Sequence, residues 1–158
     1  MENVSIKESA EKGPLISVKN LVKCFGSNKV LDNISTDIYP GEKVVVIGPS
    51  GGGKSTFLRC LNRLETPTSG SIIFENEDMA DPKVNINRHR QKMGMVFQQF
   101  NLFSNMTVLR NITLAPDKIF TKHREDGVTK KEILSRNREN ALSLLRRVGL
   151  EEKADAYP

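Results

Sequence analysis

Residues 44–61 have the sequence VVVIGPSGGGKSTFLRCL. The run Val44–Ile47 is apolar without interruption, which is typical of a strand buried on both faces of a parallel sheet. The stretch Phe57–Leu61 is compatible with a helix. Between them, residues 48–56 match the pattern G-x-x-x-x-G-K-[ST], whose expected context is a strand before it and a helix after it. We call residues 48–56 the phosphate loop, and its context predicts an α/β fold.

The residue types of the phosphate loop suit a nucleotide triphosphate. The three glycines before Lys54 can adopt positive φ, so that successive backbone N–H groups turn towards one anion. The following helix adds its free N-terminal N–H groups. Lys54 supplies a cation for the β and γ phosphates, and the Ser55 hydroxyl can ligate Mg²⁺. A chance glycine-rich turn is the alternative, and the flanking patterns argue against it. The predicted nucleotide-binding residues are Gly48, Pro49, Ser50, Gly51, Gly52, Gly53, Lys54, Ser55 and Thr56.

Length and composition indicate a soluble globular protein. The 158 residues suffice for a hydrophobic core, and 27% of them are charged. No apolar run approaches the length that crosses a bilayer, and the N-terminus lacks the apolar centre of a signal peptide, so we expect a cytosolic protein. Acidic residues are mixed with the basic ones that give the net charge of +5, which favours a solvated surface and predicts no nucleic-acid partner. Cys24 and Cys60 fit neither a disulfide framework nor a metal-ligand spacing, and Cys60 is expected in the core.

Two strands are expected before the phosphate loop. Residues 1–14 are polar and are expected to form a mobile tail. Ile16–Val18 alternates apolar and polar residues and can extend to Phe25. A turn at Gly26 separates it from Ile34–Ile38, which shows the same alternation. Strands with one wet face are usually antiparallel, so these two are expected to pair in that way.

More elements are expected after the phosphate loop. Strands are predicted at Ser71–Glu75 and Met93–Phe97, and the basic residues His89–Lys92 are expected on a solvated face. The helix that follows the loop has a predicted apolar face formed by Phe57, Leu61 and Leu64.

Two further helices are expected towards the C-terminal end. Thr107 can cap a short helix that runs towards Leu114 and that Pro116 stops. A longer helix begins at Thr129 and ends just before Gly149, a residue type that favours a helix end. The predicted apolar face of this helix consists of Ala141, Leu144, Leu145 and Val148.

The phosphate loop alone does not distinguish kinases, GTPases and transport ATPases. The stretches of sequence around it do distinguish them. They are Val18-Lys19-Asn20-Leu21, Phe25-Gly26, Val30-Leu31-Asp32-Asn33-Ile34-Ser35, Gly41-Glu42-Lys43, Leu61–Glu65, Pro67–Gly70 and Gly94–Phe103. Together they resemble the ATPase subunit of ABC transporters. With Asn111–Pro116, the stretch Gly94–Phe103 is similar to the polar amino acid importer branch. The resemblance covers about residues 16–158.

The resemblance implies roles for residues outside the phosphate loop. Phe25 matches the aromatic residue that stacks on adenine, and a buried core phenylalanine is the alternative. Gln98 matches the glutamine that reaches Mg²⁺ or the attacking water when the site closes, and a solvent-facing turn residue is the alternative. The resemblance thus implies Lys54 and Gln98 as catalytic residues, Ser55 and Gln98 as metal ligands, and ATP and Mg²⁺ as cofactors.

The resemblance also implies partners and domains. Phe100–Met106 matches the surface that receives the integral membrane subunits, where an exposed apolar patch would be functional. A second copy of the ATPase subunit would close over ATP, and the protein would lie peripherally at the cytoplasmic face of the membrane. The implied divisions are a flexible tail at 1–14, a nucleotide-binding core with an antiparallel β-subdomain at 15–115, and a partial helical subdomain at 116–158.

The sequence departs from the family pattern in two ways. Gly52 stands where the family usually has serine or another small side chain, which keeps the amide donor. The sequence ends at Tyr157-Pro158, where the family continues to its Ser-Gly-Gly-Gln signature. That signature, the Walker B strand with its aspartate, the following glutamate and the switch histidine have no match. His89 and His123 fill none of these roles.

The expected fold is therefore an α/β P-loop NTPase of the ABC ATPase type. It has an N-terminal antiparallel β-subdomain, the start of the helical subdomain and an incomplete core sheet. Two functions follow: the ATP-binding subunit of an amino acid importer or, for these 158 residues alone, a nucleotide-binding module without turnover. A small-molecule kinase fits less well, because two strands and Phe25 precede the loop.

Overall fold

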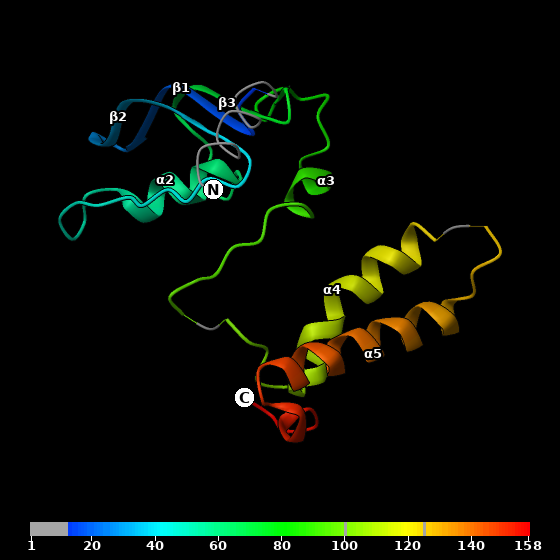
Figure 1. Cartoon of the computed structure of the whole chain (residues 1–158). Coiled ribbons are helices and arrows are strands. Elements are labelled where there is room, and N and C mark those ends of the chain that lie inside the picture. Colours follow the sequence, from blue (N-terminus) through cyan, green and yellow to red (C-terminus); the bar gives the residue numbers. More distant parts are fainter. Residues whose placement is uncertain (1–12, 100, 125) are drawn as a thin grey trace, which may run out of the picture. The chain divides into compact units, whose positions relative to one another are not determined.

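The computed structural model describes residues 13–99, 101–124 and 126–158. The predicted tail therefore lies, apart from residues 13 and 14, outside the described residues. The chain divides into two compact units, Met1–Met95 and Val96–Pro158, each of which is described by itself. The expected boundary between residues 115 and 116 falls within a single helix (Figure 1), and the expected division into domains stays a prediction.

The first unit is built on a four-stranded antiparallel sheet. Strands β1 (Ile16–Phe25) and β2 (Asn28–Ile38) form a long hairpin, whose register pairs Ile16 with Ile38 and Phe25 with Asn28. Strand β3 (Ser69–Phe74) pairs with the other edge of β1, and the short β4 (Glu77–Asp78) pairs with β3, which gives the order β2-β1-β3-β4. The predicted antiparallel pair before the phosphate loop is confirmed.

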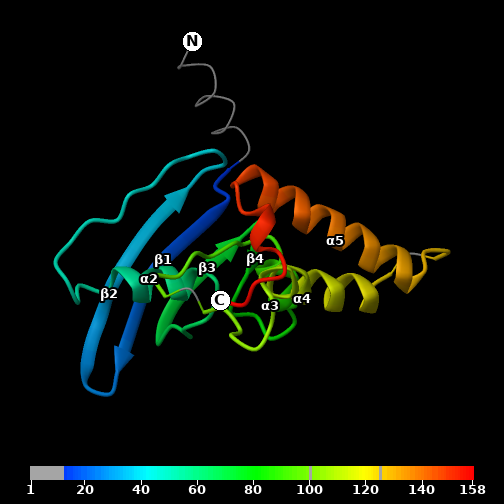
Figure 2. The same cartoon turned by 90° about the horizontal axis from the view of Figure 1, so that it is seen from below.

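Helix α2 (Lys54–Leu61) packs on this sheet (Figures 1 and 2). Cys60 is fully buried, as the sequence predicts, and burial raises the pKa of its thiol. Leu64 was expected on the same face but is exposed, because the helix ends at Leu61 and Arg63 takes a left-handed backbone with φ 58°. The core cluster consists of Val18, Leu21, Leu31, Phe57, Cys60, Leu61, Ile72, Phe74 and Met79.

Two predicted strands, Val44–Ile47 and Met93–Phe97, are wrong: both segments have irregular backbone. The side chains of Val45 and Ile47 are 80% and 87% exposed, and that of Val96 is 99% exposed. A strand needs a neighbour for its backbone N–H and C=O groups. Within the residues that the structure describes, neither segment has a paired strand. The sheet of the described residues therefore lacks these two predicted strands.

Of residues 89–92, which were expected on a solvated face, Gln91 and Lys92 are exposed, whereas His89 is buried and Arg90 is half-buried. His89 lies in the short helix α3 (Ile86–Arg90) and is only 4% exposed. Its Nε2 lies 2.7 Å from Glu77 Oε2, and its ring meets the edge of the Phe74 ring at 5.5 Å between centroids. Arg90 donates to the backbone carbonyls that follow α2, at 3.0 Å and 2.7 Å. These two side chains therefore hold α3 against the sheet and against the segment that follows α2.

Helix α4 (Val108–Lys122) opens the second unit and begins with Thr107 as its cap, as predicted. The prediction that Pro116 stops it is wrong. A proline inside a helix removes one backbone hydrogen bond, but tertiary contacts hold the next turn in place. The Asp117 carboxylate accepts from Arg110 Nη1 at 2.7 Å and from Asn137 Nδ2 of the neighbouring helix at 2.9 Å.

Helix α5 (Lys130–Arg147) has strong signals at both ends. Thr129 and Glu132 form a capping box, and the hydrogen bonds from Thr129 lower the pKa of the Glu132 carboxyl. At the other end Gly149 has φ 72°, and the backbone N–H groups of Gly149 and Leu150 close a Schellman motif. A 3₁₀ turn, η1 (Glu151–Lys153), follows. Of the predicted apolar face only two members are buried, Ala141 and Leu145, while Leu144 and Val148 are exposed.

The two helices share a core of their own, formed by Leu109, Ala141, Leu145 and Ala154. The backbone N–H of Leu109 also donates to the carbonyl of Ala154 at 2.9 Å, which ties the C-terminal segment to the start of α4. Among the helices that the structure describes, none is both long and apolar enough to cross a membrane.

Gly70→Ala tests the close packing of β3 on β1. Gly70 has φ 86°, and a Cβ there would lie 2.4 Å from the Asn20 carbonyl oxygen. Gly26→Ala is the matched control, because Gly26 also has positive φ but an open space around it. Left-handed strain alone costs about 1–2 kcal/mol. We expect Gly70→Ala to lower the free energy of unfolding by about 1–3 kcal/mol more than the control, measured by denaturant unfolding. Equal losses would contradict the close approach.

Candidate phosphate-binding site

Residues 48–53 of the phosphate loop end the connection between β2 and α2, and residues 54–56 begin α2 (Figure 1). The backbone of the loop is not flat, because Gly51 and Gly53 have φ 76° and 81°, in the left-handed region that glycine tolerates best. The N–H of Gly52 donates to the carbonyl of Pro49 at 3.1 Å and closes a tight turn. The N–H of Phe57 then donates to the carbonyl of Gly53 at 2.8 Å, which starts the helix.

Gly53 is held against the sheet. A Cβ at this position would lie 2.9 Å from the carbonyl oxygen of Val30 and 3.0 Å from Leu31 Cδ2, both in β2. Any other residue would have to push the loop away from the strand, and its φ would be strained as well. Glycine therefore lets the start of α2 approach the backbone of β2 directly.

Lys54 folds back over the loop that precedes it. Its Nζ donates to the carbonyl of Gly48 at 2.9 Å and to that of Pro49 at 2.7 Å. A lysine ammonium has three N–H donors, so these two bonds leave one for a ligand. The cation is thereby kept beside the turning backbone of Gly51 and Gly53.

The N-terminus of α2 completes the set of donors. The N-cap of α2 is Gly53, which has no side chain to cap the helix. Within the described helix, the first turn contains no acidic residue. The first N–H groups of a helix have no intrahelical partner and carry the positive end of the dipole. The Ser55 hydroxyl is exposed at the same turn. Backbone donors, one ammonium and one hydroxyl are the groups that a polyphosphate with Mg²⁺ requires.

Phe25 lies at the end of β1 and is 46% exposed. The alternative that it is a core residue is therefore wrong. Phe25 pairs with Asn28 at the turn of the hairpin, and Gly53 contacts Val30 two residues further along β2. The aromatic ring and the end of the phosphate loop are thus carried by the same end of the β1–β2 hairpin, an arrangement that suits a ligand with an aromatic base and a polyphosphate.

Sequence reasoning missed Lys23. Its Nζ lies 4.6 Å from the centroid of the Phe25 ring. The signal was available, because residues two apart on a strand point to the same face. A single lysine beside an aromatic residue is, however, too common a pattern to be singled out from sequence.

Gln98 lies in an exposed bend of the second unit, whereas Lys54 belongs to the first. The predicted approach of Gln98 to the metal therefore stays a prediction.

The surface expected to receive the membrane subunits, residues 100–106, is described except for Phe100. Leu102 and Phe103 are exposed in it. The Asn111 side chain fixes the backbone of this segment: it accepts from Phe103 N–H at 2.8 Å and donates to the carbonyls of Phe103, Met106 and Thr107.

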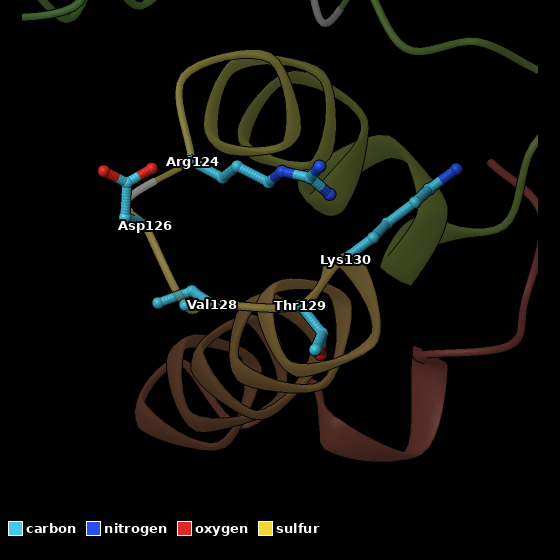
Figure 3. A pocket seen from close by; sticks show the side chains of 6 residues that line it. Arg124, Asp126, Val128, Thr129 and Lys130 are labelled. Atoms are coloured by element: carbon cyan, nitrogen blue, oxygen red, sulfur yellow. The ribbon is translucent and has the colours of Figure 1, made fainter.

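An open hollow of ≈ 370 Å³ lies in the second unit, at the connection between α4 and α5 (Figure 3). Arg124 and Lys130 extend in the same direction there, while the carboxylate of Asp126 lies on the opposite side. The Thr129 hydroxyl in its wall is already engaged by Glu132. The hollow contains none of the predicted site residues, so the phosphate loop remains the candidate site.

Comparisons with known proteins identify the family of the chain. A family model described as ABC transporter matches residues 31–158. The arginine transport ATP-binding protein ArtM of Bacillus subtilis (strain 168) is 49% identical over 144 residues, which are 91% of this chain and 56% of that protein. The glutamine transport ATP-binding protein GlnQ of Geobacillus stearothermophilus is 48% identical over 136 residues, 86% of this chain and 52% of that protein. The chain spans about half the length of these curated relatives.

The chain is also similar to solved structures of ATP-binding cassettes. The ATP-binding cassette MJ0796, in a dimeric post-hydrolysis state bound to ADP and Pi, matches with a TM-score of 0.72 and 32% identity. The match covers 90% of this chain and 61% of that one. A second dimeric structure of MJ0796, described as a bacterial ABC transporter cassette, gives a TM-score of 0.73 at 32% identity.

Proposed function

This chain belongs to the ABC transporter family, and we propose that it is the nucleotide-binding part of the ATP-binding subunit of an amino acid importer. The fold class predicted from the sequence, an α/β P-loop NTPase of the ABC ATPase type, is confirmed by the matches to ATP-binding cassettes. The observation that carries the proposal is the geometry of the phosphate loop. Gly51 and Gly53 turn the backbone, and Lys54 folds its ammonium over the turn.

The ligand proposed for this site is ATP with Mg²⁺. The amides of Gly51 and of residues 53–55, with the Lys54 ammonium, would hold the phosphates, because N–H donors and a nearby cation balance their charge. The Ser55 hydroxyl would ligate the metal, and the Phe25 ring would stack on the adenine base. Bound Mg-ATP supplies the phosphoanhydride bond whose cleavage releases energy. This chain's own residues bind and orient it, which is the main part of catalysis in phosphoryl transfer.

The partners proposed for the chain follow from its relatives. ArtM and GlnQ are named as transport ATP-binding proteins, and MJ0796 is described as dimeric. We propose that a second copy of the subunit closes over the nucleotide and brings Gln98 to the metal or the attacking water. We also propose that the exposed apolar residues at 102 and 103 contact integral membrane subunits, which would place the protein at the cytoplasmic face of the membrane.

Lys54→Ala should weaken ATP binding about ten- to a hundredfold, because a hydrogen bond to a charged group is worth about 1.5–3 kcal/mol. Isothermal titration calorimetry with Mg-ATP measures this change. Lys19→Ala is the matched control: it removes the same charge from an exposed position on β1. Unchanged affinity in Lys54→Ala, or an equal loss in the control, would refute the contact between Lys54 and the phosphates.

Phe25→Ala should weaken ATP and spare inorganic triphosphate, since only ATP has a base to stack. Stacking of a base on an aromatic side chain is worth about 1–3 kcal/mol, which corresponds to about a five- to hundredfold loss. Ile34→Ala, a truncation of another exposed apolar residue in the same hairpin, serves as control. Equal losses for both ligands would show that Phe25 acts through the fold of the hairpin instead.

Phosphate release separates the two functions that the family resemblance leaves open. We propose that these 158 residues bind Mg-ATP without sustained turnover, because the resemblance assigns the water-orienting carboxylate to a motif with no match in this sequence. A continuous phosphate assay with the 158-residue chain is expected to stay at the level of the Lys54→Ala variant. Turnover well above that level would show that this chain is an ATPase by itself.

A further inference from the structure

Lys23 is unusually well fixed for a lysine near a surface. Its side chain is 12% exposed. The ammonium lies 3.2 Å from Glu65 Oε2 and donates to the carbonyl of Thr66 at 2.9 Å. A free lysine side chain samples many rotamers, whereas two fixed partners hold this one in place.

The partners of Lys23 are themselves anchored to β1. They belong to the connection between α2 and β3, and Thr68 in that connection makes two bonds to the strand. Its N–H donates to the Val22 carbonyl at 2.8 Å, and its hydroxyl accepts from Cys24 N–H at 2.9 Å. The carboxylate and the carbonyl that hold Lys23 therefore keep a fixed position relative to the strand.

The fixed ammonium faces an aromatic ring. Lys23 and Phe25 lie two residues apart on β1, and the 4.6 Å between Nζ and the ring centroid is within the range of a cation–π interaction. The Phe25 side chain nevertheless stays 46% exposed. One face of the ring thus has a cation on it, while a large part of the ring remains open to solvent.

We infer that Lys23 is a positioning residue for the nucleobase: its ammonium, held by Glu65 and Thr66, fixes one face of the Phe25 ring so that the other face receives adenine. The inference rests on the proposed function, because it requires Phe25 to be the base platform. An exposed phenylalanine at a strand end otherwise has free rotation about its side-chain bonds. Restricting it before binding lowers the entropy lost when the base stacks.

Lys23→Met removes the ammonium and keeps the apolar stem. We expect it to weaken Mg-ATP by up to about two- to fivefold, because the free energy of a cation–π contact at a partly exposed site sets the upper limit, and to leave inorganic triphosphate unchanged. Lys23→Arg, which keeps a cation able to stack on the ring, should restore most of the affinity. Calorimetry with both ligands on the 158-residue chain measures these values.

A double variant distinguishes positioning from a merely structural role. If Lys23 acts through the ring, Lys23→Met should have no further effect on ATP affinity in the Phe25→Ala background. Glu65→Gln breaks the ion pair but keeps the Lys23 ammonium. It should therefore lower the affinity for ATP less than Lys23→Met does, and leave the affinity for triphosphate unchanged. This second variant keeps the test available if Lys23→Met lowers the thermal stability of the first unit.

The outcomes are distinguishable. Phe25→Ala with a loss selective for ATP, together with Lys23→Met and Glu65→Gln at wild-type ATP affinity, overturns the inference and leaves the proposed function in place. Equal losses for ATP and triphosphate in Lys23→Met also overturn it, because they indicate a change in the fold. Phe25→Ala without a selective loss overturns the base platform itself, and the role of Lys23 with it.

Discussion

The contact between Gly53 and β2 is the constraint on which the candidate site depends. The backbone of Gly53 lies so near the Val30 carbonyl that even a Cβ would stand 2.9 Å from its oxygen. On its other side, the helix that begins there buries Phe57 and Cys60 in the core of the sheet. The end of the phosphate loop is therefore fixed between a strand and a packed helix, without a ligand to hold it.

The β1–β2 hairpin connects two kinds of recognition. Through Val30 it supports the donors that suit a polyphosphate, and through Phe25 it presents a partly exposed ring that suits a base. Both depend on the register of one antiparallel pair, since a slip of one residue would turn every side chain of a strand to the opposite face. The sheet of the first unit thus acts as the scaffold of the site as well as the base of its core.

Local signals in the sequence predicted what depends on local chemistry. The phosphate loop, the Thr107 cap, the helix that starts at Thr129, the Gly149 helix end and the β1–β2 pair could all be recognised from residue type and spacing. The failures are non-local. Val44–Ile47 has the composition of a buried strand, but strand formation needs a neighbour, and among the described residues it has none. His89, within a basic run, is buried because Glu77 and Phe74 receive it, and the helix continues past Pro116 because Asn137 holds Asp117. None of these partners is adjacent in sequence.

Nuclear magnetic resonance can observe directly whether the backbone amides at the start of α2 bind a polyanion. A titration of the ¹⁵N-labelled chain with inorganic triphosphate is expected to shift the amide signals of Gly51, Gly53, Lys54 and Ser55 most, with saturation at a single affinity. Shifts confined to the amide signals of basic residues in α4 and α5, with the amide signals of the phosphate loop unchanged, would contradict this mode of binding.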